Sequence, residues 1–299
     1  MQVLQQSNFL YYHASNKLFL NNKEYKMRTL YISDLDGTLL DNDAKLSEEN
    51  KFRLNTLLDK GMMFTVATAR TFATVVPLLN GLKISCPVIL MNGVMIYDIA
   101  KNQAVDIEKI SHTSILNVLN CLKKHNENGF LYTWNNELTA WYEKIEVPPM
   151  KTFYEARRQQ KNFIEISLLL DVPQNEYPIY FCVCDTVDKL QPIHNELKED
   201  NGLNLFFYDD IYNPGYCFLE IASCNASKFH AANKLRSGLH VDKVIGFGDN
   251  MNDLPLLNAC DEFYAVENAH PELKKAASGI IERNIDCGVA AFLEKQFQR

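Results

Sequence analysis

Short apolar runs alternate with stretches of helical periodicity from residue 27 onward. The first three apolar runs occupy residues 30–33, 63–67 and 87–91. They are short and rich in branched side chains, so we predict strands. Residues 47–60 instead carry leucines at helical spacing, begin with Ser47 and end before a glycine, which is typical of a capped helix. Unbroken apolar strands that alternate with helices predict an α/β fold whose parallel sheet is covered by helices on both faces.

The pattern changes after about residue 110. Two alternating strands around Asn135-Asn136 predict a hairpin, and helices and strands in mixed order follow it. The βα pattern resumes after about residue 211, through YCFLEIAS and then VIGFGD. We therefore predict a Rossmann-like core domain from residues 27–109 and 212–299, with an inserted α+β domain from residues 110–211. Residues 1–26 do not resemble a signal peptide, and we expect a poorly ordered extension or an upstream-start artefact.

The first strand leads directly into two carboxylates, Asp34 and Asp36, which Gly37 follows. Carboxylates two residues apart at the end of a strand can divide the chemistry between a nucleophile and a proton-transfer group, and can share a hard metal ion. A solvated Asp-Gly turn explains the same letters. The segment alone leaves both interpretations open.

A second acidic pair follows the strand of residues 244–247. Asp249 and Asp253 are four residues apart, so they share one face of a helix and can point into one cleft. Acids at a helix N-terminus also complement the helix dipole, and Asn252 between them is equally suited to capping.

Two further residues occupy comparable positions. Thr68 ends the strand of residues 63–67, where its hydroxyl group can hold a phosphoryl oxygen or simply cap a helix. Lys228 begins a helical stretch, a position where the helix dipole disfavours a cation. This placement indicates another task for Lys228, although surface solvation is the default for an isolated lysine.

Charge and cysteine usage narrow the class of protein. The chain has 30 lysine and arginine residues against 37 acidic residues, and no basic run interleaved with aromatics, so we expect no nucleic-acid partner. The sequence contains no run of about 18 apolar residues, so we predict no membrane span. The eight cysteines are scattered, and Cys182-x-Cys184 has no second pair to complete a zinc site. We expect reduced thiols in a cytoplasmic protein.

Taken together, four segments resemble the ordered motifs of the haloacid dehalogenase-like hydrolases, in particular the Cof-like, type-IIB-capped sugar phosphatases. DLDGTLL resembles the first motif, Thr68 in VATAR the second, Lys228 the third and GDNMND the fourth. The resemblance covers about residues 27–298 and extends to Asn92-Gly93 and Asn268-Ala269. It implies that the inserted domain is a cap that closes over the site and that the substrate is a small phosphorylated metabolite.

The resemblance also implies roles for these residues. Asp34 would form an aspartyl-phosphate, and Asp36 would act as general acid and base. Mg²⁺ would be held by the carboxylates of Asp34 and Asp249 and the backbone carbonyl of Asp36, with Asp253 behind them. The remaining assignments are phosphate binding by Thr68, Lys228 and Asn252, and weaker substrate contacts by Arg70 and Asn92.

Two alternatives stay open, and two positions depart from the family pattern. A phosphomutase on the same scaffold would pass the phosphoryl group to another sugar hydroxyl, and a catalytically silent binding module would retain the motifs without turnover. Ala69 stands where the family has glycine, and Glu267 also replaces a common glycine. The physiological substrate and the oligomeric state are not predicted.

Overall fold

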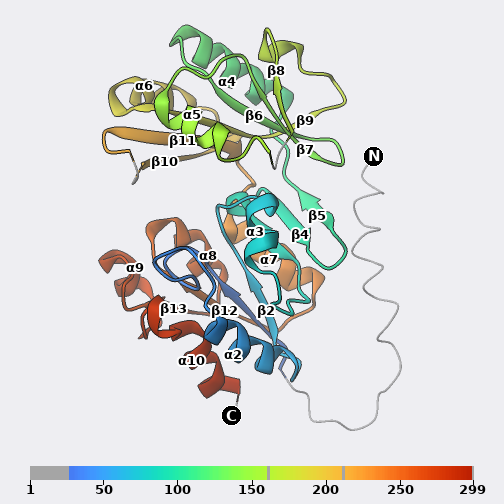
Figure 1. Cartoon of the computed structure of the whole chain (residues 1–299), viewed down its shortest axis with the longest axis vertical. Coiled ribbons are helices and arrows are strands. Elements are labelled where there is room, and N and C mark those ends of the chain that lie inside the picture. The colour runs from blue at the N-terminus through green and yellow to red at the C-terminus, as the bar shows by residue number, and fades with distance from the viewer. Residues whose placement is uncertain (1–26, 160–161, 211–212, 298–299) are drawn as a thin grey trace. The chain divides into compact units, whose positions relative to one another are not determined.

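The computed structural model describes residues 27–159, 162–210 and 213–297 (Figure 1). The predicted extension, residues 1–26, lies outside the described residues. The chain divides into two compact units: a core unit within Met1–Asp106 and Ser227–Arg299, and an inserted unit, Ile107–Ala226. In the part of the chain that the structure describes, no helix has the length and apolar character needed to cross a membrane.

The core unit is built on a parallel sheet, which confirms the predicted fold class. Its strand order is β14 (Gly279–Ile281), β13 (Glu262–Val266), β12 (Lys243–Gly248), β1 (Thr29–Ser33) and β2 (Met63–Val66). Strand β1 lies between β12 and β2 and pairs in parallel with both, and its last residue, Ser33, lies opposite Phe247 and Val66. Since the three strands end at the same level, the residues that follow them are brought to one edge of the sheet.

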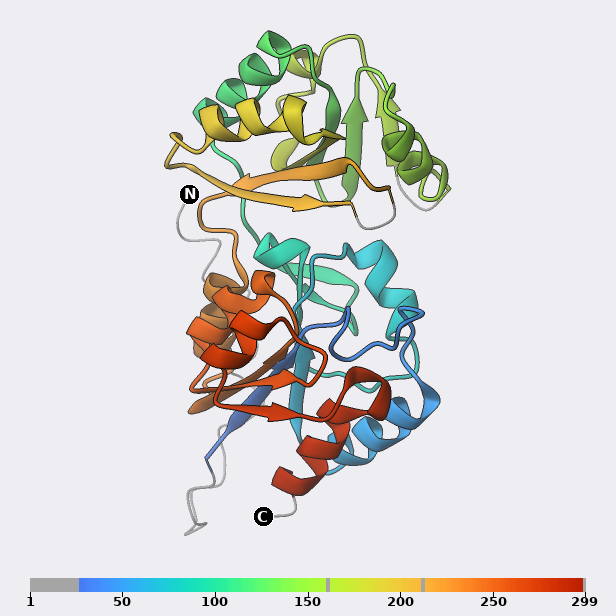
Figure 2. The same cartoon turned by 90° about the vertical axis from the view of Figure 1, so that its left-hand side faces the viewer.

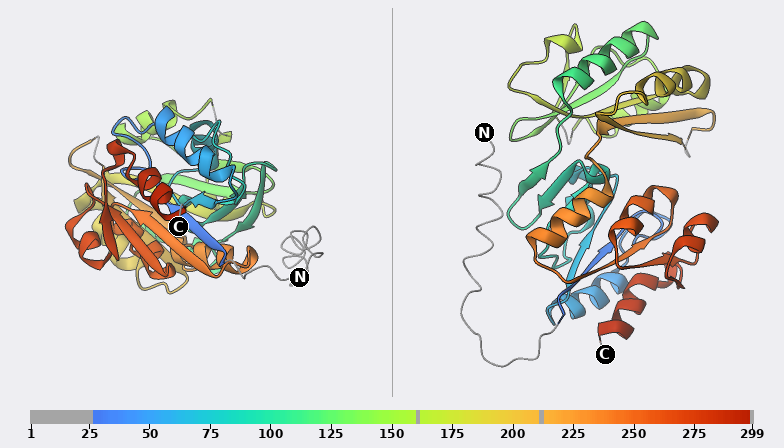
Figure 3. Two further views of the ribbon diagram at one scale, coloured as in Figure 1. Left: turned by 90° about the horizontal axis from the view of Figure 1, so that it is seen from below. Right: turned by 180° about the vertical axis from the view of Figure 1, so that it is seen from behind.

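Helices cover both faces of this sheet (Figures 2 and 3). They are α2 (Glu48–Leu58), α3 (Phe72–Leu78), α7 (Lys228–Gly238), α8 (Leu254–Ala259), α9 (Pro271–Ala276) and α10 (Gly288–Phe297). Helix α2 begins as predicted, because the Ser47 side chain accepts a hydrogen bond from the Asn50 backbone amide. Helices α2 and α10 lie side by side, joined by a two-point ion pair between Arg53 and Glu294 with distances of 3.1 and 2.6 Å.

The predicted third strand does not extend the main sheet. β3 (Val88–Leu90) pairs antiparallel with β4 (Met95–Asp98), which joins β5 (Gln103–Ile107) in a separate sheet. An isolated parallel bridge links Ala67, next to β2, to Ile89 of β3. The cause is local. Residues 91–93 all have positive φ, so the chain reverses at once and folds β4 back onto β3.

The inserted unit is built on a mixed sheet with helices packed against it. The order is β10 (Leu203–Asp209), β11 (Tyr216–Ser223), β9 (Tyr177–Thr186), β6 (Gly129–Trp134), β7 (Leu138–Tyr142) and β8 (Asn162–Glu165). Helices α4 (His112–Lys124) and α6 (Val187–Leu197) lie side by side over it, and α5 (Pro148–Glu155) completes the unit (Figure 2). The β6–β7 hairpin is confirmed. Val118, Phe181 and Ile193 are fully buried between α4, α6 and the sheet.

The structure corrects two details of this region. The YCFLEIAS segment, expected to return to the core, is strand β11, which pairs antiparallel with β10 and β9 of the inserted unit. Its alternating Cys217, Leu219 and Ile221 side chains complete the apolar core under α4 and α6, so the chain leaves this unit only after Ala226. The apolar run IEISLLLD, residues 164–171, is typical of one of the strands expected in the inserted domain, but the strand ends at Glu165 and a short 3₁₀ turn, Leu169–Asp171, follows it.

Candidate active site

The ends of β1 and β12 in the core unit gather the predicted acidic residues. Asp34 follows β1, Asp249 follows β12, and Asp253 closes the short 3₁₀ turn Met251–Asp253 that leads into α8. The backbone amide of Asp34 donates to the Phe247 carbonyl at 2.9 Å, so the β1 and β12 ends are joined at the site itself. Carboxylate oxygens of these three residues, the acidic cluster, lie within 4.8 Å of one another.

A buried lysine joins two members of the acidic cluster. Nζ of Lys228, the first residue of α7, donates to Asp34 Oδ1 and to Asp253 Oδ1, both at 2.6 Å. The Lys228 side chain is 1% exposed, which excludes the surface lysine that was the default for its sequence position. The second oxygen of Asp253 accepts from the backbone amides of Asp249 and Asn250. Asp253 therefore fixes both Lys228 and the loop that carries Asp249.

Burial and mutual repulsion control the protonation of the acidic cluster. Burial and the charge of Asp253 raise the pKa of Asp34 well above its usual range, against the opposing effect of Lys228. The same two causes raise the pKa of Asp249 to about 7, although Thr38 donates a hydrogen bond to it. Burial opposes the charge of Lys228, but Asp253 and Asp34 outweigh burial and raise its pKa. With three carboxyl groups against one ammonium, the cluster favours a further cation.

The loop after β1 is shaped to fit the acidic cluster. Gly37 has a φ of +76°, and a Cβ atom there would collide with the Asp249 carboxylate. Thr38 Oγ1 donates to Asp249 Oδ1 at 3.1 Å, a contact that sequence reasoning missed although Thr38 directly follows the acidic motif. Asn268 Nδ2 donates to the Gly37 carbonyl at 2.7 Å, so the stretch after β13 holds the loop in place.

The Asp36 side chain forms an ion pair with Arg70 and is not a member of the acidic cluster. Arg70 Nε and Nη2 donate to the two carboxylate oxygens of Asp36 at 2.7 and 2.5 Å. Such a two-point ion pair fixes the plane of the carboxylate as well as its position. Arg70 was expected as a substrate contact, and nothing in its sequence position indicated that it contacts Asp36.

Thr68 and Asn92 lie together beside the end of β2. Thr68 is 1% exposed, its Oγ1 accepts from the Arg70 backbone amide, and its carbonyl accepts from the Asn92 amide. Asn92 is 4% exposed with a left-handed backbone, and its Oδ1 has no hydrogen-bond partner among the described residues. Gly93, with a φ of +99°, packs so tightly on the Ser227 backbone that no Cβ would fit. The β3–β4 turn thereby contacts the residue that precedes Lys228.

Three other residues that the sequence analysis singled out are exposed: Asn252, Ala69 and Glu267. Asn252 lies on the exposed side of the turn that carries Asp253, so the structure does not bring it into the cluster with Lys228. Ala69 is exposed and does not have a positive φ, so the extra methyl group at this departure from the family pattern causes no backbone strain. Glu267, the other departure, is also exposed.

The acidic cluster has the donor chemistry of a site for a hard divalent cation. Its potential ligands are all oxygen atoms, which Mg²⁺ prefers, and the buried carboxylates repel one another when ionised. Gly37 leaves the space beside Asp249 free of side-chain atoms from the first loop. The residues present therefore fit Mg²⁺.

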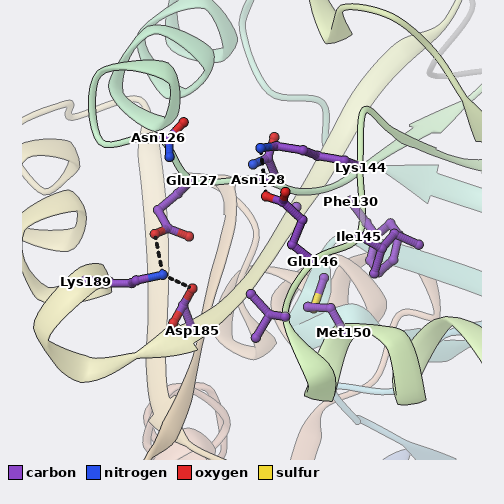
Figure 4. Close-up of a pocket in the computed structure, with 12 residues that line it drawn as sticks. Asn126, Glu127, Asn128, Phe130, Lys144, Ile145, Glu146, Met150, Asp185 and Lys189 are labelled. Atoms are coloured by element: carbon purple, nitrogen blue, oxygen red, sulfur yellow. Dashed lines mark hydrogen bonds and ion pairs between the residues drawn. The ribbon is translucent and has the colours of Figure 1, made fainter.

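The inserted unit carries a pocket of its own (Figure 4). Lys189 Nζ lies 2.7 Å from Asp185 and 3.4 Å from Glu127, both nearly buried carboxylates, while Phe130 and Met150 form part of the apolar lining. Burial and the charge of Asp185 raise the pKa of Glu127. Lys189 forms ion pairs with both acids on one side of the pocket, so the charge there is more nearly balanced than in the acidic cluster.

Comparison with known proteins assigns the family. The model of the haloacid dehalogenase-like hydrolases matches residues 31–293. A 5-amino-6-(5-phospho-D-ribitylamino)uracil phosphatase of Bacillus subtilis is 27% identical over 282 residues, covering 88% of this chain and 96% of the relative. A pyridoxal phosphate phosphatase of Escherichia coli is 24% identical over 270 residues, covering 87% and 95%.

Solved structures share the fold. A haloacid dehalogenase-like hydrolase from Bacteroides thetaiotaomicron superposes with a TM-score of 0.73 at 22% identity, covering 91% of this chain and all of that one. A sugar phosphatase of subclass IIB of the same superfamily gives a TM-score of 0.68 at 15% identity, covering 90% and 98%. The chain belongs to the haloacid dehalogenase-like hydrolases, as the sequence motifs predicted.

Proposed function

We propose that the protein is a Mg²⁺-dependent phosphatase that hydrolyses small phosphorylated metabolites, sugar phosphates in particular, through an aspartyl-phosphate. Membership of a hydrolase family and the phosphatase names of the relatives support the class of phosphoric monoester hydrolase. The observation that carries the proposal is the contact of Lys228 with Asp34 and Asp253 at the strand ends, next to Asp249.

In the first step Asp34 is the nucleophile. One of its carboxylate oxygens forms a bond to phosphorus while the bond from phosphorus to the alcohol oxygen breaks, and Asp36 gives its proton to the departing alcohol. Lys228 orients the Asp34 carboxylate through its 2.6 Å hydrogen bond and offsets negative charge as the transition state forms. Thr68 at the end of β2 supplies a hydroxyl group for a phosphoryl oxygen.

In the second step a water molecule releases the phosphate. Asp36, now ionised, takes a proton from the water as its oxygen bonds to phosphorus, and the bond between Asp34 and phosphorus breaks. Both carboxylates return to their starting states, so the cycle is balanced. The ion pair with Arg70 orients the ionised Asp36 carboxylate for this second transfer.

The metal would be held by carboxylate oxygens of Asp34 and Asp249 and by the backbone carbonyl of Asp36. When bound it would neutralise charge on the phosphoryl group and on the acidic cluster. Asp253 stays behind this group of ligands, because its two oxygens are occupied by Lys228 and by two backbone amides. Thr38 orients Asp249 for the same purpose.

A panel of phosphate esters tests the proposal. With Mg²⁺ present we expect phosphate release from several small phosphorylated metabolites, ranked by kcat/KM, and loss of activity when the metal is removed with EDTA. Absence of release from a broad panel would contradict the phosphatase assignment and favour a silent binding module. Formation of an isomeric sugar phosphate that depends on a bisphosphate, without free phosphate, would instead indicate a phosphomutase.

Exchange of Arg70 for glutamine tests its contact with Asp36. If Arg70 orients the acid, loss of the two-point contact is expected to lower kcat by about 10²-fold, the scale of a 1 Å misplacement, with KM little changed. Steady-state kinetics on the best substrate measures the two constants separately. A raised KM at unchanged kcat would instead make Arg70 a substrate contact. Arg53→Gln, which alters an ion pair to Glu294 in the same unit, is the matched control.

A further inference from the structure

A second group of metal-ligating side chains lies in the inserted unit. Cys121 is in the last turn of α4, His125 caps the C-terminus of the same helix, and Glu196 is in the last turn of α6. Residues four apart on a helix share one face, so the thiol and imidazole groups of α4 point toward the neighbouring helix. The sequence analysis did not predict this group, because its third member, Glu196, is 71 residues beyond His125.

The three side chains are already close enough for one ion. Their ligand atoms, one each from thiol, imidazole and carboxylate, lie within 4.8 Å of one another. His125 Nε2 and Glu196 Oε2 are 3.2 Å apart, a separation that two ligands of one tetrahedral zinc ion also have. Cys121 is 3% exposed, whereas the side chains of His125 and Glu196 are 25% and 41% exposed. The group thus has a buried sulfur ligand and an open side through which an ion can enter.

We propose that Cys121, His125 and Glu196 form a zinc site that joins α4 to α6. Sulfur, nitrogen and oxygen donors together suit Zn²⁺ and disfavour Mg²⁺, which binds oxygen ligands. The chain supplies three ligands, and water completes the tetrahedron. This set differs from the all-carboxylate acidic cluster of the core unit in donor chemistry.

Charge balance is compatible with binding. The thiol proton passes to solvent as the sulfur–zinc bond forms, so the thiolate and the Glu196 carboxylate neutralise the dication. Lys124 Nζ lies 2.8 Å from the same oxygen of Glu196 that faces His125. Its side chain is 65% exposed, so the ammonium group can move into water when the ion takes its place. Binding fixes the C-terminal ends of both helices and stabilises the inserted unit by mass action.

Cobalt substitution tests this site without recourse to enzymatic activity. The full chain is titrated with Co²⁺ in excess Mg²⁺, which occupies oxygen-ligand sites, and the thiolate-to-cobalt absorption band is followed. Zn²⁺ is then added to displace the cobalt. We expect one equivalent of Co²⁺ with a thiolate band, displacement by Zn²⁺, and a rise in the unfolding temperature with Zn²⁺.

Matched variants assign the ligands. Cys121→Ser is expected to abolish the band, and His125→Gln to weaken Zn²⁺ binding by at least about a hundredfold. Cys224→Ser, an exposed cysteine, and His112→Gln, at the opposite end of α4, are expected to bind as the unaltered chain does. Circular dichroism establishes that each variant is folded. A missing band in the unaltered chain, or a band that persists in Cys121→Ser, would overturn the proposal.

Discussion

Replacing Asp34 with asparagine is expected to lower turnover by at least about 10⁴-fold, because the amide cannot form the bond to phosphorus. The fold should survive this change. Burial and repulsion from Asp253 raise the pKa of Asp34, and asparagine has nearly the same volume and removes that repulsion. Lys228 also keeps its second contact, the 2.6 Å hydrogen bond to Asp253. We therefore expect an inactive protein whose thermal unfolding temperature is not lowered by more than a few degrees.

Phosphate release under saturating Mg²⁺ and thermal unfolding followed by circular dichroism measure the two quantities. Asp43→Asn is the matched control, because Asp43 lies in the same loop but is exposed. Activity of Asp34→Asn within tenfold of the unaltered enzyme, with Asp43→Asn also active, would remove Asp34 from the nucleophile's role. Trapping phosphate on the unaltered chain but not on Asp34→Asn would support that role directly.

Replacing Lys228 with methionine is expected to lower the free energy of unfolding by about 3–5 kcal/mol in the absence of divalent metal, and to abolish turnover. Methionine fills similar volume but leaves the buried carboxylates of Asp34 and Asp253 without their common donor. An uncompensated buried charge is more costly than the net value of the ion pair itself. The loss of stability therefore measures the cost of leaving the Asp34 and Asp253 carboxylates buried without a partner cation.

Urea unfolding in EDTA measures this loss. Lys234→Met, on the same helix, removes an ion pair to Asp106 that is partly exposed, and is expected to cost no more than about 1 kcal/mol. Adding Asp34→Asn to Lys228→Met removes one of the two stranded charges, so the double variant should regain part of the lost stability. If the double variant is less stable than Lys228→Met alone, the electrostatic explanation is wrong.

The sequence predicted what depends on local pattern. Apolar runs that end in acids identified β1 and β12, and the parallel order of strands placed Asp34, Asp249 and Asp253 at one edge. Lys228 stood out because a cation at the start of a helix needs a partner, and the structure supplies two carboxylates.

What the sequence did not predict are contacts between distant segments. Arg70 and Asp36 are 34 residues apart, and no periodicity links a side chain in a loop to another in a second loop. The sequence of β11 is that of an ordinary apolar strand. The sheet that it joins is determined by its pairing with β9 and β10, which the apolar run alone does not predict. The edge position of β3 depends on three consecutive residues with positive φ, and the first of them, Met91, is a residue type that rarely adopts that conformation.

The position of β1 between β2 and β12 has a consequence during synthesis. Its partner β2 emerges from the ribosome about 30 residues later, but its other partner, β12, begins at Lys243, after the entire inserted unit. Until then one edge of β1, the strand that precedes Asp34, has no neighbouring strand, whereas the inserted unit is contiguous and can fold first. Nascent chains stalled before β12 should therefore expose an unpaired strand edge and bind chaperones more strongly than chains stalled after β13.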